Sequence, residues 1–271
     1  MKFNRELENK ALDLYNRIED YVLKEDYKGY DPYDGLMSPI FRLPLFRSNK
    51  IIRLVFQQVF RRLAFNLRPM FKIQKELNPV TLGLCIQTYS YRLCTKGISS
   101  EKKSFYINEI SKLICVLINI STKGYSGICW GYNFDWEARY AKIPAFHPTV
   151  VATGIVTNGF YECLMSLNKV FDNKDGNELM DENVLAKKVI NQIKELLLSA
   201  SEFVMQDLNK SYEGDTFCYS YSPTDTQRVY NATMMGARLL SQIYSITNDE
   251  KYVNEASNIF GHNFQCLNSL K

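Results

Sequence analysis

The chain has 271 residues, a formal net charge of +4 and 46% hydrophobic residues, the composition of a globular protein with a substantial core. A charge this small does not by itself indicate a nucleic-acid partner, and the longest apolar run, at 113–120, is too short to span a bilayer. The seven cysteines show no C-x-x-C pair and no Cys/His metal spacing. We therefore expect reduced thiols in a cytoplasmic protein without a metal or other cofactor.

Helical periodicity dominates the chain, and strand-like alternation appears only around 217–221. No low-complexity linker divides the sequence, so we expect one all-α domain over 1–271. The expected helices cover 3–27, 49–67, 79–96, 102–121, 148–171, 181–209, 230–247 and 249–268.

The segment Tyr30-Asp-Pro-Tyr-Asp-Gly35 places two carboxylates three positions apart around a proline. Asp31 and Asp34, with the ring of Tyr30, could clamp the hydroxyls of a sugar. Asp before Pro and Asp before Gly are also common in turns, and a turn is the favoured interpretation.

The segment 35–75 contains no acidic residue and nine basic ones. A basic amphipathic helix can lie on an anionic membrane surface. We expect this helix to pack instead as an outer helix with its apolar side in the core, and peripheral contact with the inner membrane through 47–72 is the alternative. The apolar stripe comprises Ile52, Val55, Phe56, Val59, Phe60 and Leu63.

Three helix starts resemble one another, at 78–83, 147–152 and 230–236, and each helix is followed by a second one. Each start combines a polar residue or proline, an early threonine and a small residue where a neighbouring helix can approach. This recurrence predicts an array of antiparallel helix pairs. The long loops at 67–78, 122–147 and 211–230 should then lie at one end of the array.

The loop at 124–136 holds both tryptophans of the chain, and its three glycines indicate turns rather than a helix. Aromatic rings stack on the apolar faces of pyranose rings, and carboxylates accept hydrogen bonds from hydroxyls or transfer protons. The alternative is a long connection that its aromatic residues anchor in the core. The site candidates are Trp130 and Trp136 for stacking and Tyr132 and Asp135 for proton transfer.

Asp135 and Glu137 flank a tryptophan, so in an extended loop they point to opposite sides. We expect Asp135 to face the site and Glu137 to form an ion pair with Arg139. His147 stands before a proline at a helix start, where it could cap the helix or act as an acid or base. A lone histidine is more often structural, and both roles stay open.

The loop before the helix at 230 carries a further group of candidates. Arg228 could bind an acidic sugar or a phosphate, although an ion pair with Asp225 that holds the loop is the favoured interpretation. Tyr221 and Asn231 are candidates for substrate binding, and Asp225 for catalysis.

Three segments, 30–35, 130–149 and 220–232, together with the helix pairs, resemble an α/α toroid of the six-hairpin glycosidase and terpenoid-cyclase type. Within that type they are similar to a family found in bacterial surface-polysaccharide gene clusters. The resemblance implies a helical toroid and a link to glycan chemistry. A complete toroid needs more helices than the eight expected, so we expect an incomplete one of about four hairpins in a shortened or C-terminally truncated chain.

These observations predict a carbohydrate-active protein whose partner is a glycan or a sugar-containing small molecule, and no nucleic acid. A hydrolase would use two carboxylates, such as Asp135 and Asp225. A lyase or uronyl epimerase would use Tyr132 or His147 as the base and Arg228 to neutralise a carboxylate. The alternative function is a non-catalytic glycan-binding or scaffold protein of a polysaccharide assembly system. An isoprenoid-handling protein is less favoured, since the chain lacks an Asp-rich diphosphate motif; no oligomeric state follows from the sequence.

Overall fold

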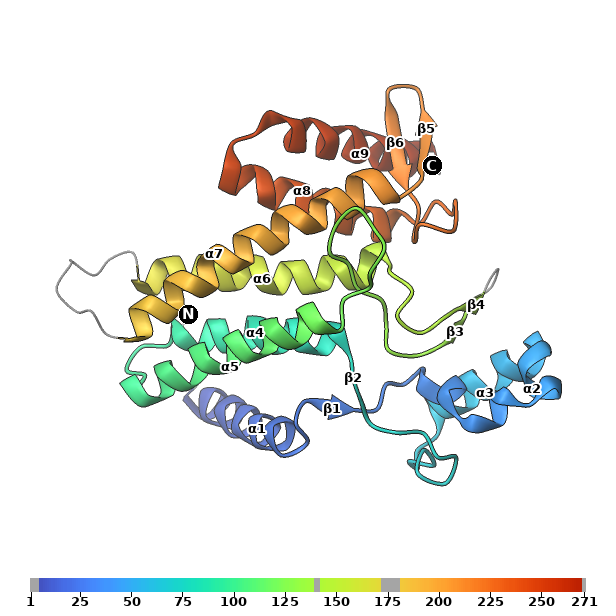
Figure 1. Cartoon of the computed structure of the whole chain (residues 1–271), viewed down its shortest axis with the longest axis horizontal. Coiled ribbons are helices and arrows are strands. Elements are labelled where there is room, and N and C mark those ends of the chain that lie inside the picture. The colour runs from blue at the N-terminus through green and yellow to red at the C-terminus, as the bar shows by residue number, and fades with distance from the viewer. Residues whose placement is uncertain (1–4, 139–141, 172–180, 270–271) are drawn as a thin grey trace. The chain divides into compact units, whose positions relative to one another are not determined.

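The computed structural model describes residues 5–138, 142–171 and 181–269. These residues are mostly helical, as Figure 1 shows, which confirms the prediction of a chain dominated by helices. All eight expected helices are present with ends close to the expected ones. They are α1 (Arg5–Lys24), α3 (Lys50–Arg62), α4 (Pro79–Leu93), α5 (Ser100–Asn119), α6 (Val150–Phe171), α7 (Asp181–Glu202), α8 (Tyr230–Thr247) and α9 (Glu250–Ser269).

Shorter elements fill the connections. The expected alternation at 217–221 corresponds to a strand that pairs with the strand before it, whereas the two other antiparallel ribbons have strands of two residues each. A single turn of π-helix, η3 (Phe203–Asp207), extends α7. The remaining elements are η1 (Asp34–Met37), η2 (Pro39–Arg42), α2 (Pro44–Ser48), β1 (Lys28–Gly29) with β2 (Glu76–Leu77), β3 (Trp136–Glu137) with β4 (Lys142–Ile143), and β5 (Lys210–Glu213) with β6 (Thr216–Tyr219).

The chain folds as two compact units. Unit 1 comprises residues 1–78 and 133–144, and unit 2 comprises residues 79–132 and 145–271. Unit 1 is therefore built from two separate stretches of sequence. A single domain over 1–271 stays a prediction.

Unit 2 consists of three helix pairs. Helix α4 packs on α5, α6 on α7, and α8 on α9, and α6 also packs on both α4 and α8. Figure 1 shows that the two helices of each pair run in opposite directions. Helices α4, α6 and α8 thus form one layer of neighbours, and all three begin at the same end of the unit.

The helices of this layer touch through glycines. A Cβ atom on Gly159 of α6 would lie 2.3 Å from the carbonyl oxygen of Gly83 on α4, and one on Gly83 would lie 2.9 Å from the Cα atom of Val156. On the other side of α6, a Cβ atom on Gly154 would lie 2.7 Å from the Cβ atom of Met235 on α8. The backbones approach this closely because no side chain stands between them.

Helix α6 is the centre of the unit 2 core. Among the described helices it alone is long and apolar enough to cross a membrane by length and composition, and 67% of its most apolar window is buried. Burial of that window is the pattern of a core helix. The six cysteines with described side chains, at 85, 94, 115, 129, 163 and 218, are free, and Cys266 lies outside the described side chains.

Unit 1 is organised around four phenylalanines, Phe41, Phe56, Phe60 and Phe71, whose neighbouring ring centroids lie 4.5–5.3 Å apart. The apolar stripe of α3 was expected to face the core. Phe56 and Phe60 do so, but Val55 and Val59 of that stripe are 57% and 47% exposed. The expectation was wrong for these two positions, because the phenylalanines that pack inward lie about 100° farther around the helix.

We expect Gly159→Ala to destabilise unit 2 by about 1–3 kcal/mol, because the added methyl group overpacks the contact between α4 and α6. Helix propensity alone would give the opposite sign, since alanine stabilises a helix interior by about 1 kcal/mol relative to glycine. Chemical denaturation of the whole chain measures the difference. Gly29→Ala, whose Cβ atom would have no neighbour within 4 Å, is the control. A stabilised Gly159→Ala variant would contradict the close contact.

Candidate functional site

Two long loops rich in aromatic residues, 122–147 and 211–230, meet in unit 2 at the end where α6 and α8 begin (Figure 1). The backbone N–H of Val150 donates to the carbonyl oxygen of Tyr221, with the two atoms 3.0 Å apart. The hydroxyl oxygen of Thr224 lies 2.9 Å from Nε2 of His147, in a hydrogen bond between the two loops. The recurring helix starts in the sequence predicted that these two loops would lie at the same end.

The chain just before His147 is held tightly by backbone contacts. The N–H of Phe146 donates to the carbonyl oxygen of Tyr132, and the hydroxyl of Thr122 donates to the carbonyl oxygen of Phe146. A Cβ atom on Gly131 would lie 2.0 Å from the carbonyl oxygen of His147, so only glycine fits there. Phe146 itself has a φ of 60°, which is rare for a bulky residue, and its ring is 43% exposed. The loop therefore holds a partly exposed phenylalanine in a strained backbone conformation.

Trp130 lies in the core beneath this surface. Its side chain is completely buried, and its indole N–H donates to the carbonyl oxygen of Leu117 at 2.8 Å. Its backbone N–H bonds to the hydroxyl of Thr153, and its ring packs edge-on against Phe160. Because this ring has no exposed surface, it cannot stack on a sugar in this structure. Trp130 therefore has a structural role.

His147 and Tyr221 are half-buried groups that both favour the neutral form. Burial lowers the pKa of His147 below its ordinary 6.5, and the carboxylate of Asp225 opposes this shift. Burial also raises the pKa of Tyr221, as do the phenol of Tyr132 and Asp225, while a hydrogen bond with Thr149 acts in the other direction. The neutral imidazole of His147 and the neutral phenol of Tyr221 thus both interact with the carboxylate of Asp225.

Asp225 holds the second loop together. Its carboxylate accepts the backbone N–H groups of Tyr221, Ser222 and Gln227 at 2.8–3.2 Å and the hydroxyl of Ser222 at 2.6 Å. Both oxygens are therefore engaged by the chain itself. The ion pair expected between Asp225 and Arg228 is not among those of the described residues, because the carboxylate binds backbone instead. Arg228 and Asn231 are exposed.

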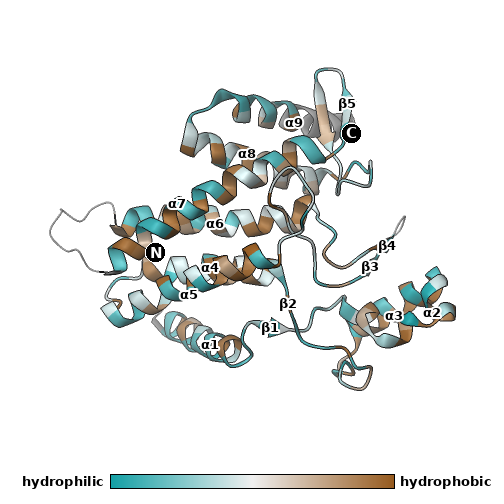
Figure 2. Cartoon of the chain, in the orientation of Figure 1, coloured by the Kyte–Doolittle hydropathy of each residue, from teal (hydrophilic) through white to brown (hydrophobic). Residues whose placement is uncertain are grey.

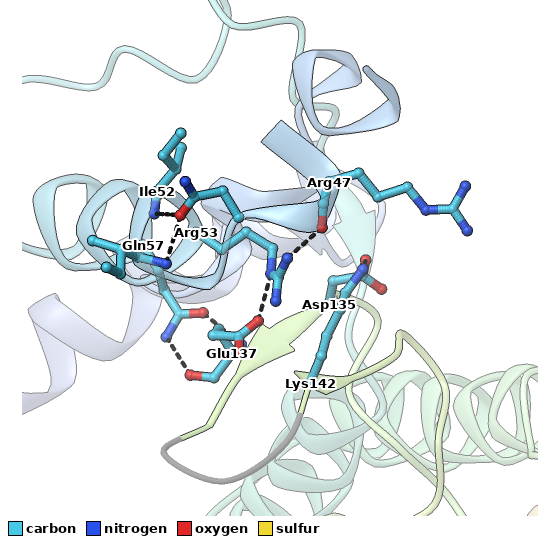
Figure 3. A network of polar contacts seen from close by, with 9 residues as sticks. Arg47, Ile52, Arg53, Gln57, Asp135, Glu137 and Lys142 are labelled. Carbon is cyan, nitrogen blue, oxygen red and sulfur yellow. Dashed lines mark hydrogen bonds and ion pairs between the residues drawn. The ribbon is translucent and has the colours of Figure 1, made fainter. Parts of the chain in front are cut away.

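Asp135 and Glu137 belong to unit 1 and hold the β3–β4 ribbon in place (Figure 3). Asp135 forms an ion pair with Lys142. Glu137 lies 2.6 Å from Nε of Arg53, and both side chains are nearly buried, at 2% and 11% exposed. Gln57 accepts from the N–H and donates to the carbonyl of Glu137, at 2.9 and 3.4 Å. The expected partner, Arg139, lies outside the described residues, and the partner seen for Glu137 is on α3.

The segment at 30–35 forms the favoured turn in unit 1. Asp31 accepts the N–H of Tyr33, and Asp34 accepts the N–H of Asp31, at 2.9 and 3.0 Å. Arg68 binds the carboxylate of Asp34 and the carbonyl of Asp31, both at 2.7 Å. Burial raises the pKa of both aspartates, and Arg68 opposes this shift. The guanidinium of Arg68 also lies 5.6 Å from the ring centroid of Tyr30.

The structure thus divides the sequence candidates between the units. Unit 2 brings together Tyr132, His147, Tyr221 and Asp225, with Trp130 beneath them. Asp135, Trp136, Tyr30, Asp31 and Asp34 belong to unit 1, so the unit 2 site is built without them. Phe146, Thr149 and Thr224 were not among the residues predicted for the site. Only Phe146 carries a recognisable sequence signal, an aromatic residue next to the histidine. No group of His, Cys, Asp and Glu that could hold a metal ion occurs among the described side chains.

Comparisons with protein-family models, with curated proteins and with solved structures gave no match. The family suggested by the sequence motifs therefore stays a prediction. The function is argued below from the residues of the unit 2 site.

We expect Glu137→Gln to destabilise unit 1 by about 3–5 kcal/mol, because it leaves the charge of Arg53 buried without its partner. Asp135→Asn is the matched control on the same ribbon. Its ion pair with Lys142 is more exposed, and pairs of this kind contribute about 0–1 kcal/mol. Thermal unfolding and hydrogen exchange of α3 measure both variants. Equal effects would show that the Arg53 pair does not anchor the ribbon.

We expect the imidazole of His147 to titrate below pH 6.5, since burial lowers its pKa. The unfolded chain then binds the proton first, so the contribution of His147 to stability is full above pH 6.5 and is lost as the pH falls through its folded pKa. Proton NMR titration measures the pKa, and His147→Gln assigns the signal. A midpoint at or above 6.5 would refute the buried, neutral imidazole.

Proposed function

We propose that this chain is a carbohydrate-active protein of bacterial surface-polysaccharide metabolism that binds a glycan or glycan precursor at the meeting loops of unit 2. The observation that carries this proposal is the partly exposed Phe146, on a strained backbone directly before the neutral His147, in the loop that meets the loop of the neutral Tyr221. A ring fixed at the surface offers a stacking face at little cost in conformational entropy, and the polar groups next to it bind hydroxyls.

The arrangement favours a lyase or uronyl epimerase over a hydrolase. Hydrolysis needs two carboxyl groups across the scissile bond. The oxygens of Asp225 are already bonded to backbone and Ser222, and Asp135 belongs to unit 1. A neutral imidazole can instead accept the proton next to a uronate carboxylate, with Tyr132 or Tyr221 as its phenolic partner. Arg228, exposed in the same loop, would neutralise that carboxylate.

The helix pairs of unit 2 support the toroid part of the proposal. In an α/α toroid, inner helices lie side by side, outer helices cover them, and loops before the inner helices form one mouth. Helices α4, α6 and α8 would be the inner helices, and α5, α7 and α9 the outer ones. We infer that unit 2 is an incomplete toroid and that the protein works in the cytoplasm, at the inner membrane where surface glycans are assembled.

The second candidate is a non-catalytic glycan-binding or scaffold protein. It is favoured by the structural use of Asp225 and Trp130, which leaves aromatic and hydroxyl groups at the surface without a free carboxylate pair. Both candidates share the same binding surface. They differ in whether His147 and the tyrosines move protons.

We expect oligosaccharides that contain uronic acid to bind wild-type protein, with Phe146→Ala weakening binding by about 1–2 kcal/mol through the lost stacking face. Tyr91→Ala on α4, where the ring is 50% exposed near the far end of the helix, is the control and should bind like wild type. Isothermal titration measures both. Unchanged affinity of the Phe146 variant would remove the binding surface from this loop.

We further expect His147→Gln to lower turnover by about 100-fold or more while affinity changes little, since loss of a general base affects mainly the transition state. A lyase is detected by the absorbance of the new C=C bond, and an epimerase by incorporation of solvent deuterium at the abstracted carbon. Binding without either signal in wild-type protein would favour the non-catalytic candidate.

A further inference from the structure

Unit 1 presents three apolar side chains of α3 to solvent, which together form an exposed stripe. Ile51, Val55 and Val59 follow one another on successive turns and are 72%, 57% and 47% exposed. A shallow apolar groove of about 480 Å³ runs along the same helix, lined by Leu54, Val55, Gln58, Val59, Arg62 and Leu63. Neither the phenylalanine cluster nor the β3–β4 ribbon covers this side, because both pack on the other side of the helix.

The exposed apolar side chains continue before and after the stripe. Leu43 and Leu45, at the start of α2, are 54% and 68% exposed, and Phe65 and Met70, after α3, are each 75% exposed. Figure 2 shows apolar and polar residues alternating through α2 and α3. Single exposed apolar residues are common on protein surfaces, but a run of large ones over one short segment indicates an interaction surface.

All charged residues in the segment 35–75, which contains α2 and α3, are basic. Residues 35–75 carry nine basic and no acidic residues, and because the whole chain carries +4, the other residues together carry −5. Arg53, Arg68 and Lys75 form ion pairs with carboxylates of unit 1. The side chain of Arg47 points away from the Glu137 network in Figure 3. The exposed basic residues include Arg42, Arg47, Arg61, Arg62 and Lys72.

Helix α1 of the same unit provides a comparison. It also exposes large apolar side chains, among them Leu7 and Ile18 at 59% and 62%. Its charges are mixed, however, with four basic and five acidic residues between Arg5 and Lys24. Helices α2 and α3 therefore differ from α1, because they combine exposed apolar side chains with basic residues and no acidic residue.

We propose that unit 1 binds anionic lipid bilayers through the segment 43–72, with α3 lying in the plane of the interface. The large apolar side chains would enter the boundary between headgroups and acyl chains, and the basic side chains would contact the anionic headgroups. The bilayer fits better than a protein partner, since positive charge spread along the whole segment matches a laterally uniform negative surface.

The surface is preformed. The Phe56 and Phe60 rings and the buried Arg53–Glu137 pair hold the inner side of α3 in unit 1, so the stripe faces outward without any rearrangement. Binding through a preformed helix avoids the entropy of ordering a disordered segment. This membrane site is independent of the glycan site proposed for unit 2, and either can fail without the other.

Co-sedimentation of the full chain with vesicles tests the proposal. We expect binding to phosphatidylcholine vesicles that contain phosphatidylglycerol, and at least about tenfold weaker binding to phosphatidylcholine alone. Binding should weaken with added salt above about 0.15 M, since the attraction is screened. A Phe65→Trp variant should show emission quenched by brominated lipids. Absence of binding to anionic vesicles at low salt would overturn the proposal.

Paired variants separate charge from apolar contact. Arg47→Gln with Arg62→Gln should weaken binding at least about tenfold, because each basic side chain near an anionic surface contributes about fivefold. Ile51→Ser with Val55→Ser should weaken it also at high salt. The controls are Lys187→Gln with Lys188→Gln, exposed on α7, and Leu7→Ser with Ile18→Ser on α1. Controls that weaken binding as much as the α3 variants would refute the site.

A second copy of the chain is the competing occupant of the stripe. Light scattering over a range of protein concentrations distinguishes the two cases. A dimer that Ile51→Ser with Val55→Ser dissociates, together with vesicle binding that those changes leave intact, would assign the stripe to self-association and overturn the proposal. A monomer that binds anionic vesicles through the stripe supports it.

Discussion

The contact between the backbones of α4 and α6 at Gly83 and Gly159 sets the geometry of unit 2. Because these helices touch without intervening side chains, their axial positions are fixed along with their separation. The start of α6 is fixed in consequence, and the Val150 N–H there meets the carbonyl of Tyr221. The candidate site is thus positioned by a contact far from its own chemistry, and the loops need supply only the side chains.

The helices could be predicted because amphipathic periodicity over three or more turns is a strong signal. The two-residue strands β1 to β4 could not, since a pattern of period two needs more residues than they contain. The exposed side of α3 was missed for another reason. Its apolar residues extend around more than one face, and only the positions of Phe41 and Phe71, distant in sequence, decide that Phe56 and Phe60 turn inward.

The sequence indicated which loops matter but not what each side chain does there. The last carbonyl groups of a helix have no hydrogen-bond partner within the helix. Trp130 is buried because its indole N–H donates to one of these groups, the carbonyl of Leu117 in the last turn of α5. Asp225 is engaged because the chain reverses around it and turns three N–H groups toward its carboxylate. Both outcomes depend on backbone groups, which have no signature in the side-chain sequence.

The discontinuity of unit 1 has a consequence for the order of folding during synthesis. Arg53 and Glu137 are 84 residues apart, and α4 and α5 of unit 2 are made between them. Unit 1 therefore cannot complete its buried ion pair until residues 79–132 of unit 2 have been synthesised. A fragment ending at residue 78 would lack Glu137, the partner of Arg53 on α3, so we expect the first 78 residues to be less stable alone than within the whole chain.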